Sequence, residues 1–488
     1  MRRKLDFKTR LFFASVFGWF WVLQAEAQND LTLSFMENIY QASYVNPAAI
    51  PVYKVSVGLP GISSIGYQIT NTGFSYGELI KQQRGTKDST KELTGDLKGV
   101  YSILDKENYF YQGIQADLFH VKIKVRSFYF ALFAQEKIQS RFSYPQVFAD
   151  ILINGNGNYI GKTADFKNFG FDFDWYRTIG LGIAKESKHW VIGANLKYLG
   201  GIANINFDPH NSGIEVKDTY FETSSKSDMV INTSGFPQDD DPNYTKQFAD
   251  SNGNLNRSGI TNFANMFRNP GAGIDLAVTY KANDKWHFTA SVVNFGFITW
   301  KSQVYNRHVT GGADFKGFDL FGYVLKGETK PDDQYWQELK TSFQYSTSQN
   351  TYKRWLVPQL YLTAKYNVTF KTHISGMVYF EYYKKVRPAF TVSLYHKFGR
   401  VLNVVTSYNV QYGRFDNIGL GIMAKLGPCQ FYLGGDNIVA PLVRSIMEGF
   451  TIDKKVVDPI KTYNVRVGMN LVFGGVNQTN KQSYEVKK

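Results

Sequence analysis

The sequence has one cysteine, Cys429, and only 14 prolines in 488 residues. A single cysteine excludes an intrachain disulfide, so an exported chain of this length needs another source of stability. No run of 18 apolar residues follows the first 27 residues, which excludes a transmembrane helix there. HExxH, Cys/His and Gly-x-Ser-x-Gly motifs are also missing. We therefore predict no enzyme, no catalytic residue, no metal site and no cofactor.

The charge pattern gives no sign of a nucleic-acid partner. The chain carries a formal charge of +14, but its Lys and Arg residues are scattered and form no stripe interleaved with aromatic residues. Asp239, Asp240 and Asp241 lack the spacing of a calcium loop, so we interpret them as part of a solvated loop. The seven histidines are well separated, so a Ser–His–Asn or Asp–His site would have to be assembled from separate strands.

Residues 1–27 have the three parts of a secretory signal peptide. A basic start with five Lys and Arg residues precedes an apolar run over 11–23, and Ala25-Glu26-Ala27 is a small-x-small cleavage site. The mature chain is expected to begin at Gln28. Residues 28–51 contain a turn rather than a strand, and we expect this segment to fold into or under the rest of the protein as a periplasmic plug.

The rest of the chain is rich in aromatic residues and glycine, with 39 Phe, 32 Tyr and 43 Gly. Apolar and polar residues alternate with a period of two in many segments, as in strands with one apolar face. Long connections, expected over 71–111, 145–165, 207–272, 301–355 and 438–461, alternate strictly with short turns. This asymmetry is typical of outer-membrane barrels. The expected strands are 52–70, 112–123, 126–144, 166–185, 190–206, 273–281, 286–300, 356–367, 372–383, 388–398, 402–412, 416–426, 430–437 and 463–473.

The last strand fixes the orientation of the others. Residues 463–473 alternate strictly, and Arg466, Gly468, Leu471 and Phe473 match the pattern by which barrels are recognised for insertion. If this strand ends in the periplasm, an even count returns the N-terminus to the periplasm as well. We therefore predict an all-β fold, a transmembrane antiparallel β-barrel of fourteen strands over 52–473. Sixteen strands result if the 207–272 insert adds a hairpin around Ile214 to Ile231. A polar tail, 474–488, follows.

Tryptophans near the ends of the expected strands suggest two aromatic belts. Trp190 and Trp286 follow short turns, whereas Trp300 and Trp355 lie where long loops begin or end. Tryptophan favours the membrane–water interface, so these four residues support a membrane barrel over a soluble one.

The face opposite the apolar one carries polar residues that would line the lumen. Two interpretations remain open: a hydrated path for a polar solute, or a network that pairs internally and closes the barrel. The lumen residues proposed for a solute path are Asn195, Lys197, Asp275, Lys365, Glu381, Asn409, Gln411, Lys425 and Arg466.

Several motifs, in order, resemble a family of outer-membrane β-barrels of unknown function. They are Asn46-Pro47-Ala48, Ser143-Tyr144-Pro145 and the stretches 55–61, 161–164, 272–276, 296–300, 417–421 and 464–473. This resemblance covers nearly the whole mature chain and implies location and fold, but it transfers no substrate and no catalytic residue.

The turn Asn46, Pro47 and Ala48 is also similar to the N-terminal hatch of long-chain fatty acid transporter-like barrels, which have fourteen strands. Relatives of that fold include barrels that hold protein clients of a secretion system. The polar lumen departs from a fatty acid conduit.

The predicted location is the outer membrane of a Gram-negative bacterium, and the predicted function is a channel or transporter for small or amphipathic solutes. The alternative is a non-conducting scaffold or partner-binding barrel that serves protein export or cell-surface assembly. The expected partners are outer-membrane lipid and the barrel assembly machinery, with a protein partner bound through the external loops in the alternative.

Overall fold

The computed structural model describes residues 30–75, 78, 80–84, 91–218, 223–236, 256–312, 314–315, 342–383, 385–411, 414–438 and 461–475, and the structural statements below concern these residues. The signal peptide, the carboxylates at 239–241 and the tail from residue 476 onward lie outside them.

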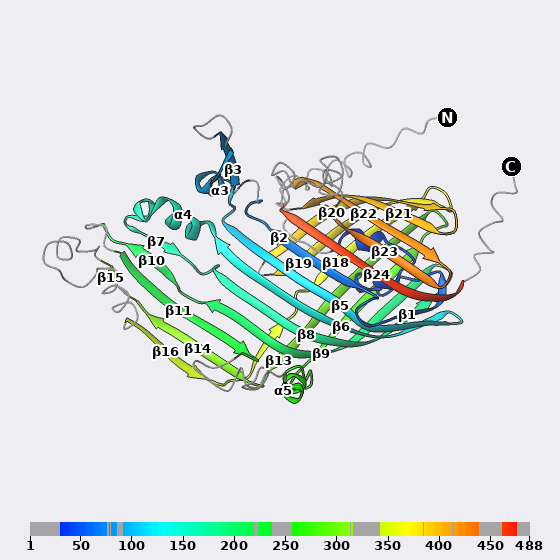
Figure 1. Ribbon diagram of the computed structural model, residues 1–488, viewed down its shortest axis with the longest axis horizontal. Helices are drawn as coiled ribbons and strands as arrows, with labels where there is room; N and C mark the ends of the chain where they lie inside the picture. Colours follow the sequence, from blue (N-terminus) through cyan, green and yellow to red (C-terminus); the bar gives the residue numbers. More distant parts are fainter. Residues whose placement is uncertain are drawn as a thin grey trace, which may run out of the picture.

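Fourteen antiparallel strands form a closed barrel, seen at the right of Figure 1. The first strand is split into β1 (Tyr53–Gly58) and β2 (Ile65–Asn71). Both pieces pair with the last strand, β24 (Thr462–Gly475), on one side and with β5 (Glu107–Val125) on the other. This pairing closes the sheet and removes its edges. The predicted fold class and the count of fourteen are confirmed.

The rest of the wall follows the order of the sequence. Six short connections join strands at one end of the barrel, which we call the short-turn end, and the opposite end is the long-loop end. The remaining wall strands are β6 (Phe128–Pro145), β8 (Gly170–Glu186), β9 (Trp190–Pro209), β12 (Asn269–Lys281), β13 (Trp286–Trp300), β17 (Tyr352–Trp355) with β18 (Gln359–Asn367), β19 (Thr372–Tyr383), β20 (Lys385–Phe398), β21 (Leu402–Gln411), β22 (Arg414–Leu426) and β23 (Cys429–Asp436).

Alternation along each strand separates an apolar outside from a polar inside. On β24, Val467 and Phe473 are about half exposed on the outer surface, whereas Arg466 and Asn470 are buried in the lumen. The same pattern exposes Leu181, Ile192 and Leu196 on β8 and β9. An apolar outer surface on a closed sheet suits lipid, because every wall strand finds its backbone partners within the barrel. The chain is a membrane-spanning barrel.

The sheet of the wall continues beyond the barrel at the left of Figure 1, and we call this extension the outer sheet. The end of β9 pairs with β11 (Thr223–Ser234), and β11 pairs with β14 (Val304–Gly311), which pairs with β16 (Phe343–Ser348). β10 (Gly213–Val216) and β15 (Asp314–Phe315) pair with the outer end of β11. The hairpin expected around Ile214 to Ile231 is β10–β11. It joins this sheet and not the wall, so the sixteen-strand alternative is wrong.

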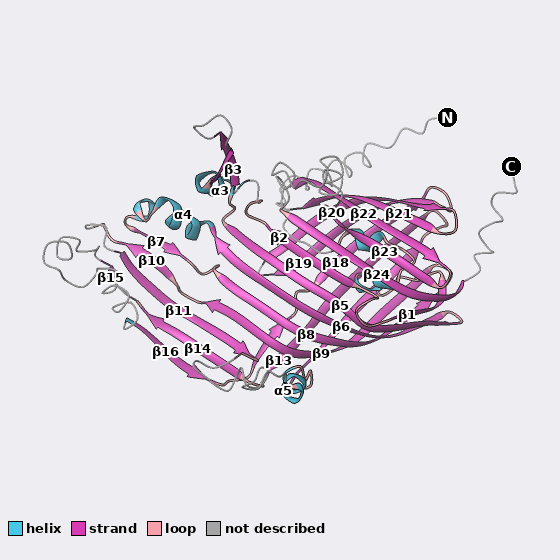
Figure 2. Cartoon of the chain, viewed as in Figure 1, coloured by secondary structure: helices cyan, strands magenta, loops and turns pink. Residues whose placement is uncertain are grey.

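The remaining elements are short and lie mostly at the long-loop end. Figure 2 shows α4 above β7 and β10 at the upper left, and α5 at the bottom below β9 and β13. The elements are the pair β3 (Ile80–Arg84) and β4 (Lys91–Gly95), α3 (Leu97–Ile103), α4 (Gln146–Asn154), η3 (Gly157–Tyr159), β7 (Lys162–Asp165) and α5 (Arg257–Phe263).

Two sequence expectations about the wall are wrong. First, the ladders of β19 with β20 and of β21 with β22 run to Tyr383↔Lys385 and Gln411↔Arg414, so two connections at the long-loop end are short. Strict alternation of short turns and long loops therefore fails there. Second, Trp300 is fully buried and is not part of an aromatic belt.

The cause of the second error is a bulge on β13. Asn294 has a positive φ of 60°, and the register of β12 with β13 shifts between Ile274 and Leu276, opposite this residue. A bulge inserts one residue, so side chains beyond it point to the opposite face. Phe295 is therefore 55% exposed outside, while Trp300 packs inside against Tyr176 and Leu199.

The N-terminal segment, residues 30–51, fills part of the lumen and is called the plug below. Its two short 3-10 helices, η1 (Thr32–Phe35) and η2 (Tyr40–Tyr44), lie behind β23 and β24 in Figure 2. The predicted turn is present, because the Asn46 Oδ1 accepts the Ala48 N–H at 3.0 Å. A Cβ on Gly193 of β9 would lie 2.4 Å from the Pro47 backbone, so glycine is required for this contact.

Apolar side chains of the plug form a core with inward-facing residues of the wall. Leu31, Leu33, Phe35, Met36 and Ile39 are all at most 2% exposed. Burying such a side chain contributes about 1.5–3 kcal/mol, so the plug is a stable part of the fold. The wall residues of this core are Val293, Tyr361, Met377, Tyr379, Ala389, Tyr395, Val405, Met423 and Tyr432.

Candidate functional site

Buried polar pairs fasten the plug to the lumen wall. Arg466 on β24 donates from Nε to the Asp30 Oδ2 at 2.6 Å, and both side chains are less than 10% exposed. The Thr32 Oγ1 donates to the Asp436 Oδ1 on β23 at 2.5 Å. Charge-assisted hydrogen bonds of this kind offset the cost of taking the charges out of water. The start of the plug is therefore joined to the last two strands of the barrel.

Glu37 is held by an ion pair at the other side of the lumen. Lys365 on β18 donates to its Oε1 at 2.6 Å, and the His373 Nε2 lies 3.6 Å from the same oxygen. Burial raises the pKa of Glu37, but the Lys365 ammonium and His373 together lower it further, to about 2 from 4.5. Glu37 is therefore a carboxylate at neutral pH, and its attraction to Lys365 favours the docked plug.

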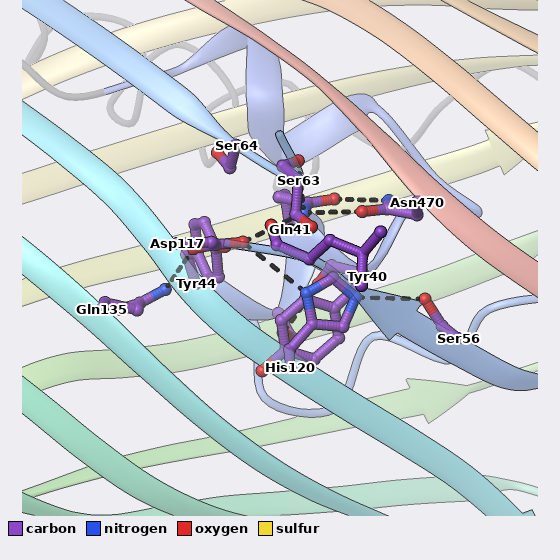
Figure 3. Close-up of polar contacts among 12 residues, drawn as sticks. Tyr40, Gln41, Tyr44, Ser56, Ser63, Ser64, Asp117, His120, Gln135 and Asn470 are labelled. Carbon is purple, nitrogen blue, oxygen red and sulfur yellow. Dashed lines mark hydrogen bonds and ion pairs between the residues drawn. The ribbon is translucent and has the colours of Figure 1, made fainter. Parts of the chain in front are cut away.

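Figure 3 shows a second cluster, centred on Asp117 of β5. Its carboxylate accepts hydrogen bonds from the Tyr44 hydroxyl, from the Gln41 Nε2 at 3.2 Å and from the Gln135 Nε2 at 3.3 Å. Gln41 and Asn470 also exchange two amide hydrogen bonds, at 3.0 and 2.8 Å. One wall carboxylate thus joins η2 of the plug to β5 and β6.

His120, in the same cluster, has neighbours in the order of a hydrolytic triad. Its Nε2 lies 3.2 Å from the Ser56 Oγ, and its Nδ1 lies 3.6 Å from the Asp117 Oδ2. The Tyr40 ring stacks on the imidazole at 3.7 Å between centroids, and Ser56, Asp117 and His120 are at most 2% exposed. A substrate cannot reach buried side chains under a stacked ring, so we assign this group to plug attachment and not to catalysis.

The C-terminal end of the plug is fixed through its backbone. Lys122 Nζ donates to the Ala49 carbonyl at 2.8 Å, and the Ser291 Oγ donates to the Val45 carbonyl at 2.7 Å. The plug therefore contacts the wall along its whole length and occupies part of the lumen.

Between the plug and the long-loop end lies a cavity of about 670 Å³. Asp30, Leu33, Tyr44 and Val45 of the plug are among the lining residues, so the plug forms part of its boundary. Its walls combine tyrosine rings with charged groups. The volume is within the range of sites for small ligands, which also combine an apolar surface with a few placed polar groups.

Most charges in this cavity are paired across the lumen. The Arg354 Nη2 donates to Asp172 at 2.9 Å, and the Arg141 Nη2 donates to Glu381 at 3.1 Å. The Tyr383 hydroxyl also donates to Asp172 at 2.6 Å, and its ring centroid lies 4.0 Å from the Arg141 guanidinium carbon. These contacts hold β6, β8 and β19 in a fixed arrangement around the cavity.

The cavity reaches a break in the barrel wall. The ladder between β13 and β18 ends at Val293↔Gln359, and pairing resumes between β13 and β17 at Phe297↔Trp355. We call the six intervening residues, 294–296 and 356–358, the wall break; all six line the cavity. One backbone bond spans it, from the Leu356 N–H to the Gly296 carbonyl at 2.9 Å.

The wall break has a local cause. Pro358 has no N–H to donate, and the Asn294 N–H donates to the side-chain Oδ1 of Asp275 on β12 at 2.8 Å instead of to a backbone carbonyl. Because lipid offers no hydrogen bonds, a wall stretch with few backbone bonds is weaker than its neighbours. Phe295 and Trp355 stand exposed on the outside next to it.

The structure places the residues predicted for the lumen in several different contacts. Asn195 and Lys197 both donate to Asp275, at 3.0 and 2.6 Å. Asn409 donates to Asp436 at 2.8 Å, and Gln411 is buried nearby on β21. Lys365, Glu381 and Arg466 make the ion pairs with Glu37, Arg141 and Asp30 given above. Lys425 lies at the short-turn end and donates to the Gly427 carbonyl at 2.7 Å. Only Glu381 and Arg466 of the nine line the cavity.

The residues of the predicted insertion pattern lie on both faces of β24. Arg466 points into the lumen and Phe473 points outward. A Cβ on Gly468 would lie 2.0 Å from the Ser63 carbonyl, so the connection between β1 and β2 packs against a residue without a side chain. Leu471 pairs with Val57 and Cys429, next to the closing seam. Recognition of this pattern during insertion stays a prediction.

Sequence reasoning missed the inward face of β5 and β6. Asp117, His120, Lys137 and Arg141 all contribute to the plug contacts or the cavity. The signal there was weak, because residues 135–141 read Gln-Glu-Lys-Ile-Gln-Ser-Arg and place polar side chains on both faces of the strand. Within the described ranges, no group of three or more His, Cys, Asp or Glu side chains is arranged to hold a metal ion. No helix in the described part of the chain is long and apolar enough to cross a membrane.

Comparison with solved structures finds membrane barrels of low identity. The Ralstonia pickettii toluene transporter TbuX is 8% identical, with 93% of this chain and 100% of that chain covered and a TM-score of 0.41. A Pseudomonas aeruginosa FadL homologue is 9% identical, with 93% and 97% covered and a TM-score of 0.37. The Pseudomonas putida toluene transporter TodX is 8% identical, with 92% and 94% covered and a TM-score of 0.36. No curated protein matches the sequence.

The fold and location therefore depend on the chain's own features: a closed sheet of fourteen strands, an apolar outer surface and polar lumen, and short turns at one end. These are the features of barrels in the outer membrane of Gram-negative bacteria, and this barrel lies there. A family model matches residues 47–436. That range runs from the plug turn to the end of β23, and the resemblance noted in the sequence is confirmed. The chain belongs to the family of unknown function DUF5723.

Proposed function

We propose that this barrel moves small amphipathic solutes from the cell exterior into the outer membrane through the wall break. The observation that carries the proposal is the cavity, which is bounded by the plug on one side and reaches the wall break on another. Short turns face the periplasm in outer-membrane barrels, so we take the long-loop end as the exterior. Solutes would then enter the cavity from outside.

The plug supports an exit through the wall over a straight path through the lumen. A straight path would have to displace the apolar core around Phe35 and Met36 and the ion pairs of Asp30 and Glu37. Opening a path at the wall break requires the loss of only the Leu356–Gly296 backbone hydrogen bond and of local side-chain contacts. The mixed lining of tyrosine rings and charges suits solutes with both an apolar and a polar part.

A reversible lock across the wall break tests this proposal. The Asn294 Nδ2 donates to the Gln359 Oε1 at 3.2 Å, so these side chains meet across the break. In a Cys429→Ser background, Asn294→Cys with Gln359→Cys should form a disulfide under oxidation. We expect uptake of a labelled amphipathic solute by cells carrying the barrel to fall at least tenfold on oxidation and to recover on reduction.

A matched control places the disulfide in an intact part of the wall. The Thr279 and Thr289 hydroxyls of β12 and β13 lie 2.9 Å apart, so Thr279→Cys with Thr289→Cys locks two strands that already pair fully. Uptake through this control should not depend on oxidation. Normal uptake through a fully oxidised Asn294→Cys/Gln359→Cys barrel would refute exit through the wall break.

A non-conducting, partner-binding barrel is the second candidate. The sheet beyond the barrel favours it, because β16 pairs with β14 and its side chains, such as Tyr345 at 70% exposure, are mostly exposed. Exposed strands at the rim of a sheet accept added strands from partners. A protein that copurifies with the barrel and is lost when residues 301–355 are shortened would support this candidate. Uptake that survives the same shortening would separate the two functions.

A further inference from the structure

Lys137 of β6 is a cation without a partner in the cavity. Its side chain points inward, because Ile138 faces Trp175 on the outer side of the ladder while Gln139 reaches Asp174 in the lumen. Within the described residues, no hydrogen bond or ion pair joins the Lys137 ammonium to another side chain. Arg141, Arg354 and Arg466, which line the same cavity, each have a carboxylate partner. Lys353 also lines the cavity without an ion pair in the described residues, but its side chain is exposed and its ammonium lies 5.3 Å from the Phe297 ring centroid. Lys137 is therefore the less exposed of the two lining cations that have no carboxylate within ion-pair distance.

Two further donors near Lys137 also lack acceptors. Gln115 lies directly opposite Lys137 in the β5–β6 ladder, and its buried Nε2 has no hydrogen-bond partner. Arg141 lies four residues further along the same strand, about 13 Å at the usual rise of a strand. Its side chain is 10% exposed and uses Nη2 for Glu381, while Nε and Nη1 have no partner.

Unpartnered donors beside a cavity indicate a ligand that supplies acceptors. Buried donors and charges are normally paired, because an unpaired group loses its hydration without compensation. A carboxylate placed at Lys137 would provide the charge that this ammonium lacks. The ring of Tyr176, the cross-strand neighbour of Lys137, and the ring of Tyr111 provide flat surfaces for the body of the solute.

We propose that the cavity binds small aromatic carboxylic acids, with the acid group at Lys137. This inference rests on the proposed function for its biological meaning, because it names the class of solute that the cavity selects. Binding itself is a separate property and is measured on the purified barrel without transport.

The test uses the full chain in detergent, with 4-hydroxybenzoate as the probe and 4-hydroxybenzyl alcohol as its neutral analogue. Affinities are measured by isothermal titration calorimetry. We expect the wild type to bind the acid at least tenfold more tightly than the alcohol, since a hydrogen bond to a charged group corresponds to roughly tenfold or more in affinity. Lys137→Met should remove this preference, and Lys137→Arg should keep most of it.

The matched control is Lys185→Met. Lys185 is exposed near the short-turn end, and its ammonium lies 5.4 Å from the Phe128 ring centroid, so its loss changes net charge equally without touching the cavity. This variant should bind as the wild type does. Retained heat-modifiable migration shows that each variant is folded.

Equal affinity of the wild type for the acid and the alcohol would overturn the proposal. Unchanged acid binding by folded Lys137→Met would overturn it as well. The two proposals can fail separately. If acid binding requires Lys137 but uptake is unaffected by the disulfide across the wall break, the binding site is supported and exit through the wall break is refuted. If the disulfide stops uptake but the barrel binds the acid and the alcohol equally, exit through the wall break is supported and the acid-binding site is refuted.

Discussion

Phe35→Ala should loosen the plug without unfolding the barrel. Phe35 is 2% exposed in the core between plug and wall, and truncation of a buried phenylalanine costs about 3–5 kcal/mol. The five large apolar side chains of the plug together contribute roughly 7–15 kcal/mol at 1.5–3 kcal/mol each. One truncation therefore removes about a third of this stabilisation. It raises the fraction of molecules whose plug has left the lumen by roughly two to four powers of ten. A second truncation, Met36→Ala, should undock the plug for most of the time.

Ion conductance in planar bilayers measures this change directly. The wild type should be closed, Phe35→Ala should give brief openings, and Phe35→Ala/Met36→Ala should give long ones. Phe398→Ala is the matched control, because Phe398 is 53% exposed on the outer surface and does not contact the plug core. It should behave as the wild type.

Protease accessibility of residues 30–51 shows independently whether the plug has left the lumen. If these residues are cleaved in the double variant and the conductance still stays at the closed level, the plug does not close the lumen, and our explanation of its role is wrong.

Three further predictions concern other contacts. The Glu37 pKa is lowered in the docked plug, so its stabilising contribution is complete above pH 4.5 and disappears as the pH falls from 4.5 to about 2; protease protection of the plug should fall over this range, and Glu37→Gln should flatten the change. Asp30→Ala leaves Arg466 as a buried unpaired charge and should destabilise the plug by about 3–5 kcal/mol, whereas Asp30→Leu/Arg466→Met should lose much less, as thermal unfolding can show. Phe473→Asp places a charge on the lipid face and should reduce the heat-modifiable barrel; normal levels would show that this residue is not needed for assembly.

The sequence was a good guide to the barrel because its main signal repeats every two residues. Alternation located the wall strands, and the direction of the last strand, with the parity of the count, gave fourteen. The plug was expected from the break in alternation at Asn46-Pro47-Ala48. The outward face of β24 was also predicted correctly, since no bulge interrupts it.

Errors appeared where alternation alone does not determine the structure. The bulge at Asn294 reversed the faces beyond it, so Trp300 was assigned outward although it is buried. The sequence also does not show which polar side chains pair with each other. Pairs such as Tyr44 with Asp117, or Arg466 with Asp30, are far apart in the chain and come together only in the closed barrel. The cavity depends on which of many inward side chains find partners. Lys137 stands out only because the described residues around it leave it unpaired.

The split first strand has a consequence for the order of assembly. β24 supplies both the seam with β1 and β2 and the arginine that holds the beginning of the plug, 436 residues earlier in the chain. Contacts between such distant residues form late, because the cost of closing the intervening loop must be met first. A chain that ends before β24 would therefore form an open sheet whose plug lacks the Arg466 contact with Asp30. Closure of the barrel and attachment of the first residues of the plug thus both depend on the last strand.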